Sequence, residues 1–130
     1  MGEARPELAR QPDPGALHTA FQEAFNRHDL DAVVSLYEPT AVLFSSGAVV
    51  EGAQRIRDFY RRLFELKPHL TLRTLKSFRS GELALLHGEW SWRATNADGN
   101  QMARQGRSVE VVRLQPDGRW QYVIDDPSSS

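Results

Sequence analysis

The sequence predicts an α+β domain in which N-terminal helices are followed by a strongly curved sheet. Three observations carry this prediction. Apolar residues recur with helical spacing in the first half of the chain, this spacing disappears from His69 onward, and turn signals then follow at regular intervals. These signals are Ser80-Gly81, Asp98-Gly99 and Pro116-Asp117-Gly118.

The composition is that of an ordinary globular protein. With 130 residues, 40% hydrophobic and 25% charged, the chain is long enough to bury a core as one domain. A formal net charge of −1 gives no field that would attract nucleic acid. The absence of cysteine excludes disulfides, thiolate nucleophiles and zinc–thiolate sites. We see neither a signal-peptide pattern nor a membrane-spanning run, and we expect a cytoplasmic protein.

The N-terminal half is predicted to hold the helices. Residues 1–12 mix charge, Pro and Gly without periodicity, so we expect a flexible N-terminal arm there and a single domain over residues 13–130. Asp13 can cap a first helix with Pro14 at its first position. The apolar residues that then recur at helical spacing are Leu17, Ala20, Phe21, Ala24 and Phe25.

A second, short helix follows. Asp29 offers its cap, and the helical spacing continues to Tyr37, until Pro39 excludes Glu38 from the helical backbone region. Two brief runs of strand formers, Ala41–Phe44 and Ala48–Val50, then predict a small hairpin.

A third helix is predicted between Gly52 and Pro68, because apolar residues again recur at helical spacing. Beyond it we expect a meander of four strands, at Leu70–Phe78, Leu83–Thr95, Gln101–Leu114 and Trp120–Asp125. The middle two strands exceed the usual length of about 5–6 residues, which indicates strong curvature or bulges.

Four local motifs occur in an order that is typical of one superfamily. They are Phe25-Asn26-Arg27-His28-Asp29-Leu30-Asp31 between the first two helices, Leu36-Tyr37-Glu38-Pro39-Thr40-Ala41-Val42 before the first strand, Val50-Glu51-Gly52-Ala53-Gln54-Arg55-Ile56-Arg57-Asp58-Phe59-Tyr60 in the third helix, and Pro116-Asp117-Gly118-Arg119-Trp120 before the last strand. From about Asp13 to Ser128 the chain resembles the NTF2-like superfamily, in particular its SnoaL-like and DUF4440-type (ketosteroid-isomerase-like) members.

The resemblance implies a cystatin-like cone of three N-terminal helices packed on a curved mixed or antiparallel sheet of about five to six strands. It also implies a pocket between sheet and helices, and a homodimer that packs sheet on sheet. Function is less constrained, because the superfamily includes isomerases, cyclases, dehydratases, hydrolases, transport factors and assembly domains.

Ketosteroid isomerases use an aspartate base and two oxyanion donors, a tyrosine and a protonated aspartic acid. Counting from the motifs, the tyrosine position falls on Phe21, the base position on Ser45, and the second donor near Glu110. Phe21 cannot donate a hydrogen bond and Ser45 is no base without a neighbouring one. Steroid isomerisation by this mechanism is therefore not expected.

Glu110 is the weak catalytic candidate that remains. If its side chain points inward, burial favours the neutral acid, which could donate a proton or bind a ligand. The alternative is an outward charge or a partner for Arg107 or Arg113.

The strand Leu83–Thr95 has one apolar and one polar face. Trp90 and Trp92 share the first, and Glu89 and Arg93 share the second with His87. Inward-facing tryptophans would bind a flat apolar ligand, whereas outward-facing ones would anchor an interface. We expect the polar face to line the cavity. Its charged cluster could then perform acid–base work, and the alternative, a cross-strand ladder of ion pairs, is the interpretation we favour.

The remaining pocket residues are predicted from their places in the fold. Phe21, Phe25 and Tyr60 lie on helices that roof the cavity, and Asp125 could reach a polar ligand at the open end of the cone or be an exposed carboxylate. The four histidines show no metal-binding spacing, and no nucleotide-binding or serine-hydrolase motif occurs, so no metal or cofactor is expected.

The first functional hypothesis is thus a homodimeric protein that binds a small apolar or amphipathic molecule of unknown identity. The second is a cofactor-independent cyclase, isomerase or hydratase-like enzyme that uses Glu110. The third is an assembly or partner-binding domain in which the face of Trp90 and Trp92 matters and the cavity is incidental.

Overall fold

The computed structural model describes residues 13–128, so the predicted arm over residues 1–12 and the final two residues lie outside the described part. Three helices and six strands occur within it. In chain order they are α2 (Ala16–Asn26), α3 (Leu30–Ser35), β1 (Tyr37–Ser45), β2 (Ala48–Glu51), α4 (Ala53–Phe64), β3 (His69–Ser80), β4 (Leu83–Thr95), β5 (Gln101–Leu114) and β6 (Trp120–Asp126).

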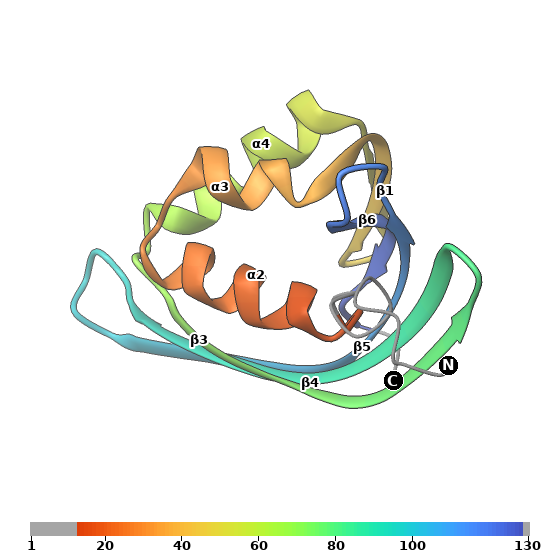
Figure 1. Cartoon of the computed structure of the whole chain (residues 1–130). Helices are drawn as coiled ribbons and strands as arrows, with labels where there is room; N and C mark the ends of the chain where they lie inside the picture. Colours follow the sequence, from red (N-terminus) through yellow and green to blue (C-terminus); the bar gives the residue numbers. More distant parts are fainter. Residues whose placement is uncertain (1–12, 129–130) are drawn as a thin grey trace, which may run out of the picture.

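The six strands form one sheet in the order β2-β1-β6-β5-β4-β3. β1 runs parallel to β6 and all other neighbours are antiparallel, so the sheet is mixed. Figure 1 shows the sheet curving around α2, with α3 and α4 on the same concave side. The predicted α+β class with a curved mixed sheet is confirmed.

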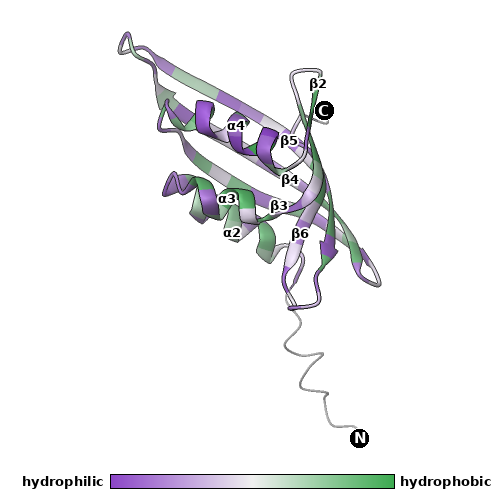
Figure 2. Ribbon diagram, turned by 90° about the horizontal axis from the view of Figure 1, so that it is seen from above, coloured by the Kyte–Doolittle hydropathy of each residue, from purple (hydrophilic) through white to green (hydrophobic). Residues whose placement is uncertain are grey.

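The curvature comes from long strands that change register. β4 and β5 contain 13 and 14 residues, and the pairing shifts between Thr74 and Lys76 on β3 and between Val111 and Val112 on β5. An extra residue in one strand bends it and increases its twist. The sheet can therefore wrap around a helix instead of lying flat beneath it. Seen from above, the helices lie along the long strands (Figure 2).

The predicted cap of the first helix at Asp13, with Pro14 at the first helical position, is wrong. The cap position of α2 is Gly15, which has no side-chain cap hydrogen bond, and the regular helix begins at Ala16. The Asp13 carboxylate lies just before it and accepts a hydrogen bond from the Gly15 N–H at 3.1 Å. Asp29 caps α3 as predicted, because its Oδ1 accepts from the Ala32 N–H at 3.1 Å.

The predicted extension of the second helix to Tyr37 is wrong. The helix ends at Ser35, and Tyr37 begins a strand that pairs with Tyr122 of β6 and buries its ring. The register of this pairing shifts between Tyr37 and Val42, so Pro39 lies where no regular ladder hydrogen bond is needed. Proline therefore sits inside β1 without breaking it.

The hydrophobic core lies between the concave face of the sheet and the helices. Helix α2 contributes Leu17, Phe21 and Phe25, and the sheet contributes Leu86 and Val112, among others. Over residues 13–128, none of the helices combines the length and the apolar character that a membrane span requires.

Candidate functional site

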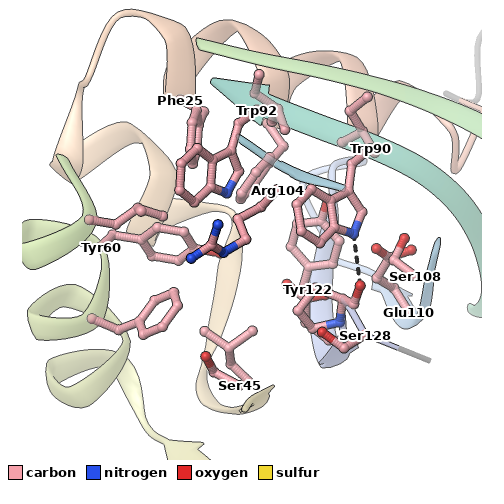
Figure 3. Close-up of a pocket in the computed structure, with 18 of the residues that line it drawn as sticks. Phe25, Ser45, Tyr60, Trp90, Trp92, Arg104, Ser108, Glu110, Tyr122 and Ser128 are labelled. Atoms are coloured by element: carbon pink, nitrogen blue, oxygen red, sulfur yellow. Dashed lines mark hydrogen bonds between the residues drawn. The ribbon is translucent and has the colours of Figure 1, made fainter. Parts of the chain in front are cut away.

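A cavity of about 270 Å³ opens between the sheet and the helices (Figure 3). Its walls are mainly aromatic and aliphatic side chains, and its polar groups come chiefly from β5 and β6. The apolar lining consists of Phe21 and Phe25 from α2, Phe59, Tyr60 and Leu63 from α4, and Leu43, Leu70, Leu72, Trp90, Trp92 and Tyr122 from the sheet. Such a lining with a few convergent polar groups is typical of small-molecule sites.

The polar side of the cavity follows from strand parity on β5. Arg104, Gly106, Ser108 and Glu110 alternate along the strand, so they share the face that Trp92, Trp90, Gly88 and Leu86 present on β4. Along its inner face β5 thus carries a guanidinium, a glycine without a side chain, a hydroxyl and a carboxyl, in that order.

Two buried carboxyl groups meet at the inner end. Glu110 and Asp125 are register partners on β5 and β6, and each is at most 5% exposed. A register shift lets both Tyr122 and Asp125 face inward, although they are three positions apart and would point to opposite faces of a regular strand. Side chains of opposed residues in a sheet are adjacent, so the two carboxyls act on one another.

His18 of α2 is the hydrogen-bond partner of Glu110. Its Nε2 lies 2.9 Å from Oε1 of Glu110, and its Nδ1 lies 2.7 Å from Oγ1 of Thr74 on β3. With Glu110 as carboxylate, Nε2 must carry a hydrogen and donate it. The pair is almost fully buried, which fixes the orientation of the Glu110 carboxyl.

Two tyrosine hydroxyl groups form a hydrogen-bonded chain that ends at the Asp125 carboxyl. The Tyr37 O–H donates to Oδ2 of Asp125 at 2.5 Å, and because its single hydrogen is used there, the Tyr60 hydroxyl donates to Tyr37 at 2.6 Å. Burial, followed by the charge of Asp125, raises the pKa of Tyr37 and of Tyr60 well above the ordinary value of tyrosine. Both phenols therefore stay protonated and act as donors.

Asp125 is the pocket carboxyl whose pKa is raised. Burial is the largest cause and the charge of Glu110 the second, and together they raise the pKa of Asp125 to about 8, although the hydrogen bond from Tyr37 acts in the opposite direction. At neutral pH its neutral acid form therefore predominates. Since Oδ2 accepts from Tyr37, the proton belongs on Oδ1, from which it can be donated.

Ser108 is an exception to the usual pairing of buried polar groups. Its hydroxyl is buried and has no hydrogen-bond partner among the described residues. It faces Gly88 across the β4–β5 pair, where a Cβ atom would lie 2.6 Å from the Ser108 Oγ and 3.1 Å from the His18 ring. A glycine is needed at this point because serine and histidine occupy the space of a side chain.

Trp90 lies across another glycine. A Cβ atom on Gly106 would come within 3.0 Å of the Trp90 ring, and the indole N–H donates to the Pro127 carbonyl oxygen at 2.7 Å. Pro127 and Ser128 themselves line the cavity. The segment after β6 is thereby held against the pocket by a pocket residue.

The expectation that the polar face of β4 lines this cavity is wrong for Glu89 and Arg93. Trp90 and Trp92 share parity with Leu86 and Glu110, and this is the face that the helices cover. Glu89 points the other way and forms ion pairs with Arg73 at 2.6 Å and Arg107 at 4.0 Å. The cross-strand ladder that was the alternative is therefore what the structure contains.

The structure brings the other predicted pocket residues to the cavity. They are Phe21, Phe25, Ser45, Tyr60, Trp90, Trp92, Glu110 and Asp125. Sequence reasoning missed His18, although it stands three residues before Phe21 and seven before Phe25 and so lies on the same helical stripe. It also missed Arg104 and Ser108, which have the strand parity of Glu110.

The arrangement provides acid–base groups and no metal site. In the part of the chain that the structure describes, no three histidine or acidic side chains are grouped as metal ligands would be. A neutral acid at Asp125 and a carboxyl held by His18 at Glu110 are two titratable groups in different surroundings, an arrangement that enzymes use for proton transfer.

Comparison with known proteins agrees with this fold. The sequence matches the family model described as a SnoaL-like domain over residues 18–123. No curated protein shows significant sequence similarity to the chain.

Solved structures similar to the chain come from several bacteria. One is a ketosteroid isomerase-like protein of Erwinia carotovora atroseptica, with 23% identity, 95% of each chain covered and a TM-score of 0.78. Another is an NTF2-like superfamily protein of Salmonella enterica, with 17% identity, 88% of each chain covered and a TM-score of 0.76. A third, from Xanthomonas campestris, is described as a candidate calcium/calmodulin-dependent protein kinase II association domain. It has 25% identity and a TM-score of 0.72, with 100% of this chain and 89% of that chain covered.

Proposed function

The chain belongs to the SnoaL-like domain family of the NTF2-like superfamily, and on that premise we propose that it binds a small amphipathic molecule in the cavity beneath its helices. The observation that carries the proposal is the contrast within the cavity, which has aromatic walls and a buried polar end at Ser108, Glu110 and Asp125. Apolar walls supply affinity, and a few placed polar groups supply orientation.

A ligand screen tests this proposal. We expect members of a metabolite collection to raise the melting temperature, because a ligand at about 100 times its Kd adds about 2.7 kcal/mol of stability. Ser45→Trp, at the half-buried end of β1, places a large ring in the cavity and should abolish the shift. Ser91→Trp puts the same ring on the exposed outer face of β4 and should retain it.

The two tryptophan variants separate binding in the cavity from binding elsewhere. Equal shifts in Ser45→Trp and in the native chain would overturn the proposal, as would a collection without any stabilising compound.

A catalytic role is a second candidate, favoured by the neutral Asp125 beside the His18–Glu110 pair. A ligand found in the screen, incubated with the protein and followed by NMR, tests it. General acid–base groups contribute about 10²–10⁴-fold in rate. Conversion of the ligand that Glu110→Gln slows by about 100-fold or more would support cyclase, isomerase or hydratase-like chemistry without a cofactor, and an unchanged ligand would exclude it for that compound.

A homodimer is proposed from the outer face of the sheet. Apolar residues on five adjacent strands are direct register partners there and form one row: Phe78, Leu85, Val111, Ile124 and Val42. In the single chain Phe78 is 56% exposed and Ile124 40% exposed. Soluble monomers rarely expose large continuous apolar patches, so a row of this kind indicates an interface. The assembly-domain alternative placed the interface on the face of Trp90 and Trp92, but these residues line the cavity. An assembly role would therefore use the apolar row on the opposite face, and one structural neighbour is described as an association domain.

Light scattering tests the dimer. At micromolar concentration we expect twice the mass of the chain for the native protein, and the mass of one chain for Ile124→Glu, which puts a carboxylate inside the row. Thr19→Glu changes an exposed residue of α2 by one charge as well and should leave the dimer intact. A native protein with the mass of one chain would contradict the prediction.

A further inference from the structure

The inner face of β5 runs the length of the cavity with a different chemistry at each end. Ser108 and Glu110 are buried at one end, whereas Arg104 is exposed at the other and still lines the cavity. Figure 3 shows the Arg104 side chain reaching toward Tyr60. Ser108 lies four positions after Arg104, which corresponds to about 13 Å of strand.

The Arg104 guanidinium has no carboxylate partner among the described residues. Within residues 13–128 its guanidinium forms no ion pair, and its one hydrogen bond is with the adjacent Ala103 carbonyl, at 2.9 Å. Arg107 on the other face of the same strand is 4.0 Å from Glu89, so acidic partners are used on that face. A guanidinium at a cavity mouth is suited to a carboxylate, which it can bind through two N–H groups.

The opposite end carries unmet hydrogen-bonding capacity. The Ser108 hydroxyl has no partner within the described chain, and of the Glu110 oxygens only Oε1 is engaged, by His18. A hydroxyl group of a ligand can accept from Ser108 and donate to Glu110, and a carbonyl can accept from Ser108. Buried polar groups without a partner reject a ligand that cannot satisfy them.

The wall between the two ends fits a flat molecule. On the neighbouring strand Trp92 lies opposite Arg104 and Trp90 lies opposite Gly106, and the Trp90 ring covers this glycine, where a side chain would collide with it. A volume of about 270 Å³ is at the low end of the range for ligand pockets, about 300–1,000 Å³. One or two rings fit such a space.

We propose that the cavity takes a planar aromatic or conjugated acid whose carboxylate pairs with Arg104. At the opposite end its hydroxyl group is bound by Ser108 and Glu110, or its carbonyl oxygen accepts from Ser108. The inference rests on the proposed binding function and names the ligand class of that same cavity. It uses the charge of Arg104 and the unpartnered Ser108, which general pocket binding does not require.

Four related probes test the two ends separately. They are para-coumarate, which has both groups, cinnamate, which lacks the hydroxyl, para-vinylphenol, which lacks the carboxylate, and styrene, which lacks both. Titration against tryptophan fluorescence and by calorimetry is expected to give para-coumarate an affinity at least about ten-fold above that of each of the other three.

Matched variants assign each end to its residue. Arg104→Gln should weaken para-coumarate and cinnamate about ten-fold and leave para-vinylphenol and styrene unchanged. Ser108→Ala should weaken para-coumarate and para-vinylphenol and leave cinnamate and styrene unchanged. Arg107→Gln removes a cation from the outer face of the same strand and should change none of the four affinities.

Several results would overturn the inference. Equal affinities for all four probes, or variants that weaken all four alike, would leave the binding function standing and remove the ligand class. Failure of all four to bind would also overturn the class. The proposed function itself is decided separately, by the broad collection and the Ser45→Trp variant.

Discussion

Replacing His18 by alanine is expected to lower the free energy of unfolding by about 3–5 kcal/mol, because it leaves the Glu110 carboxyl buried without its partner. Both side chains are at most 5% exposed, so in the folded chain the imidazole takes the place of bulk water as the partner of the carboxyl. Urea denaturation at neutral pH measures the loss. The neighbouring Thr74 also loses its partner, which adds to the effect.

Two further variants make this prediction specific. His69→Ala removes an exposed histidine of β3 and should change stability by no more than about 0.5 kcal/mol. The double variant His18→Leu/Glu110→Leu replaces the buried pair by apolar side chains and should recover most of the lost stability. A loss below about 1 kcal/mol in His18→Ala would show that the pair does not stabilise the fold.

The second large effect is expected in the pH dependence of stability, and Asp125 causes it. Its pKa is about 8 in the folded chain and about 4 in an unfolded one. Between these values the folded state holds a proton that the unfolded state has released, so stability falls as the pH rises. The contribution is complete below about pH 4 and is lost through about pH 8, at about 1 kcal/mol per pH unit.

Asp125→Asn removes this titration and keeps a neutral side chain that can accept from Tyr37. We expect the variant to match the native protein within about 1 kcal/mol near pH 5 and to exceed its stability by a few kcal/mol near pH 9. Denaturation curves at a series of pH values measure the difference. Asp98→Asn, in an exposed turn, should keep the native slope, and parallel profiles for Asp125→Asn and the native chain would refute the assignment.

Most of the fold could be predicted because its signals are local. The apolar stripe of α2, the Asp29 cap and the turns at Gly81, Gly99 and Gly118 each act within a few residues. The start of β1 could not be predicted in this way. Tyr37 continues a helical pattern in sequence, and only its pairing with Tyr122 makes it a strand residue.

The candidate site was predictable in part. The family resemblance placed Phe21, Tyr60 and Glu110 at the cavity, which all three line, but the face of β4 was assigned to the wrong side. Alternation separates two faces of a strand and does not say which one the helices cover. The answer depends on the register between β4 and β5, which is set by pairing across the sheet.

The sequence by itself therefore determined the class of the domain, the order of its elements and the residue types available to a pocket, because periodicity, caps and turns are properties of neighbouring residues. Only the tertiary structure decided which polar groups meet. His18 reaches Glu110 across 92 residues and Tyr37 reaches Asp125 across 88. Such contacts depend on how the sheet bends around α2. The raised pKa of Asp125 and the unpartnered hydroxyl of Ser108 likewise arise from burial, which no local pattern specifies.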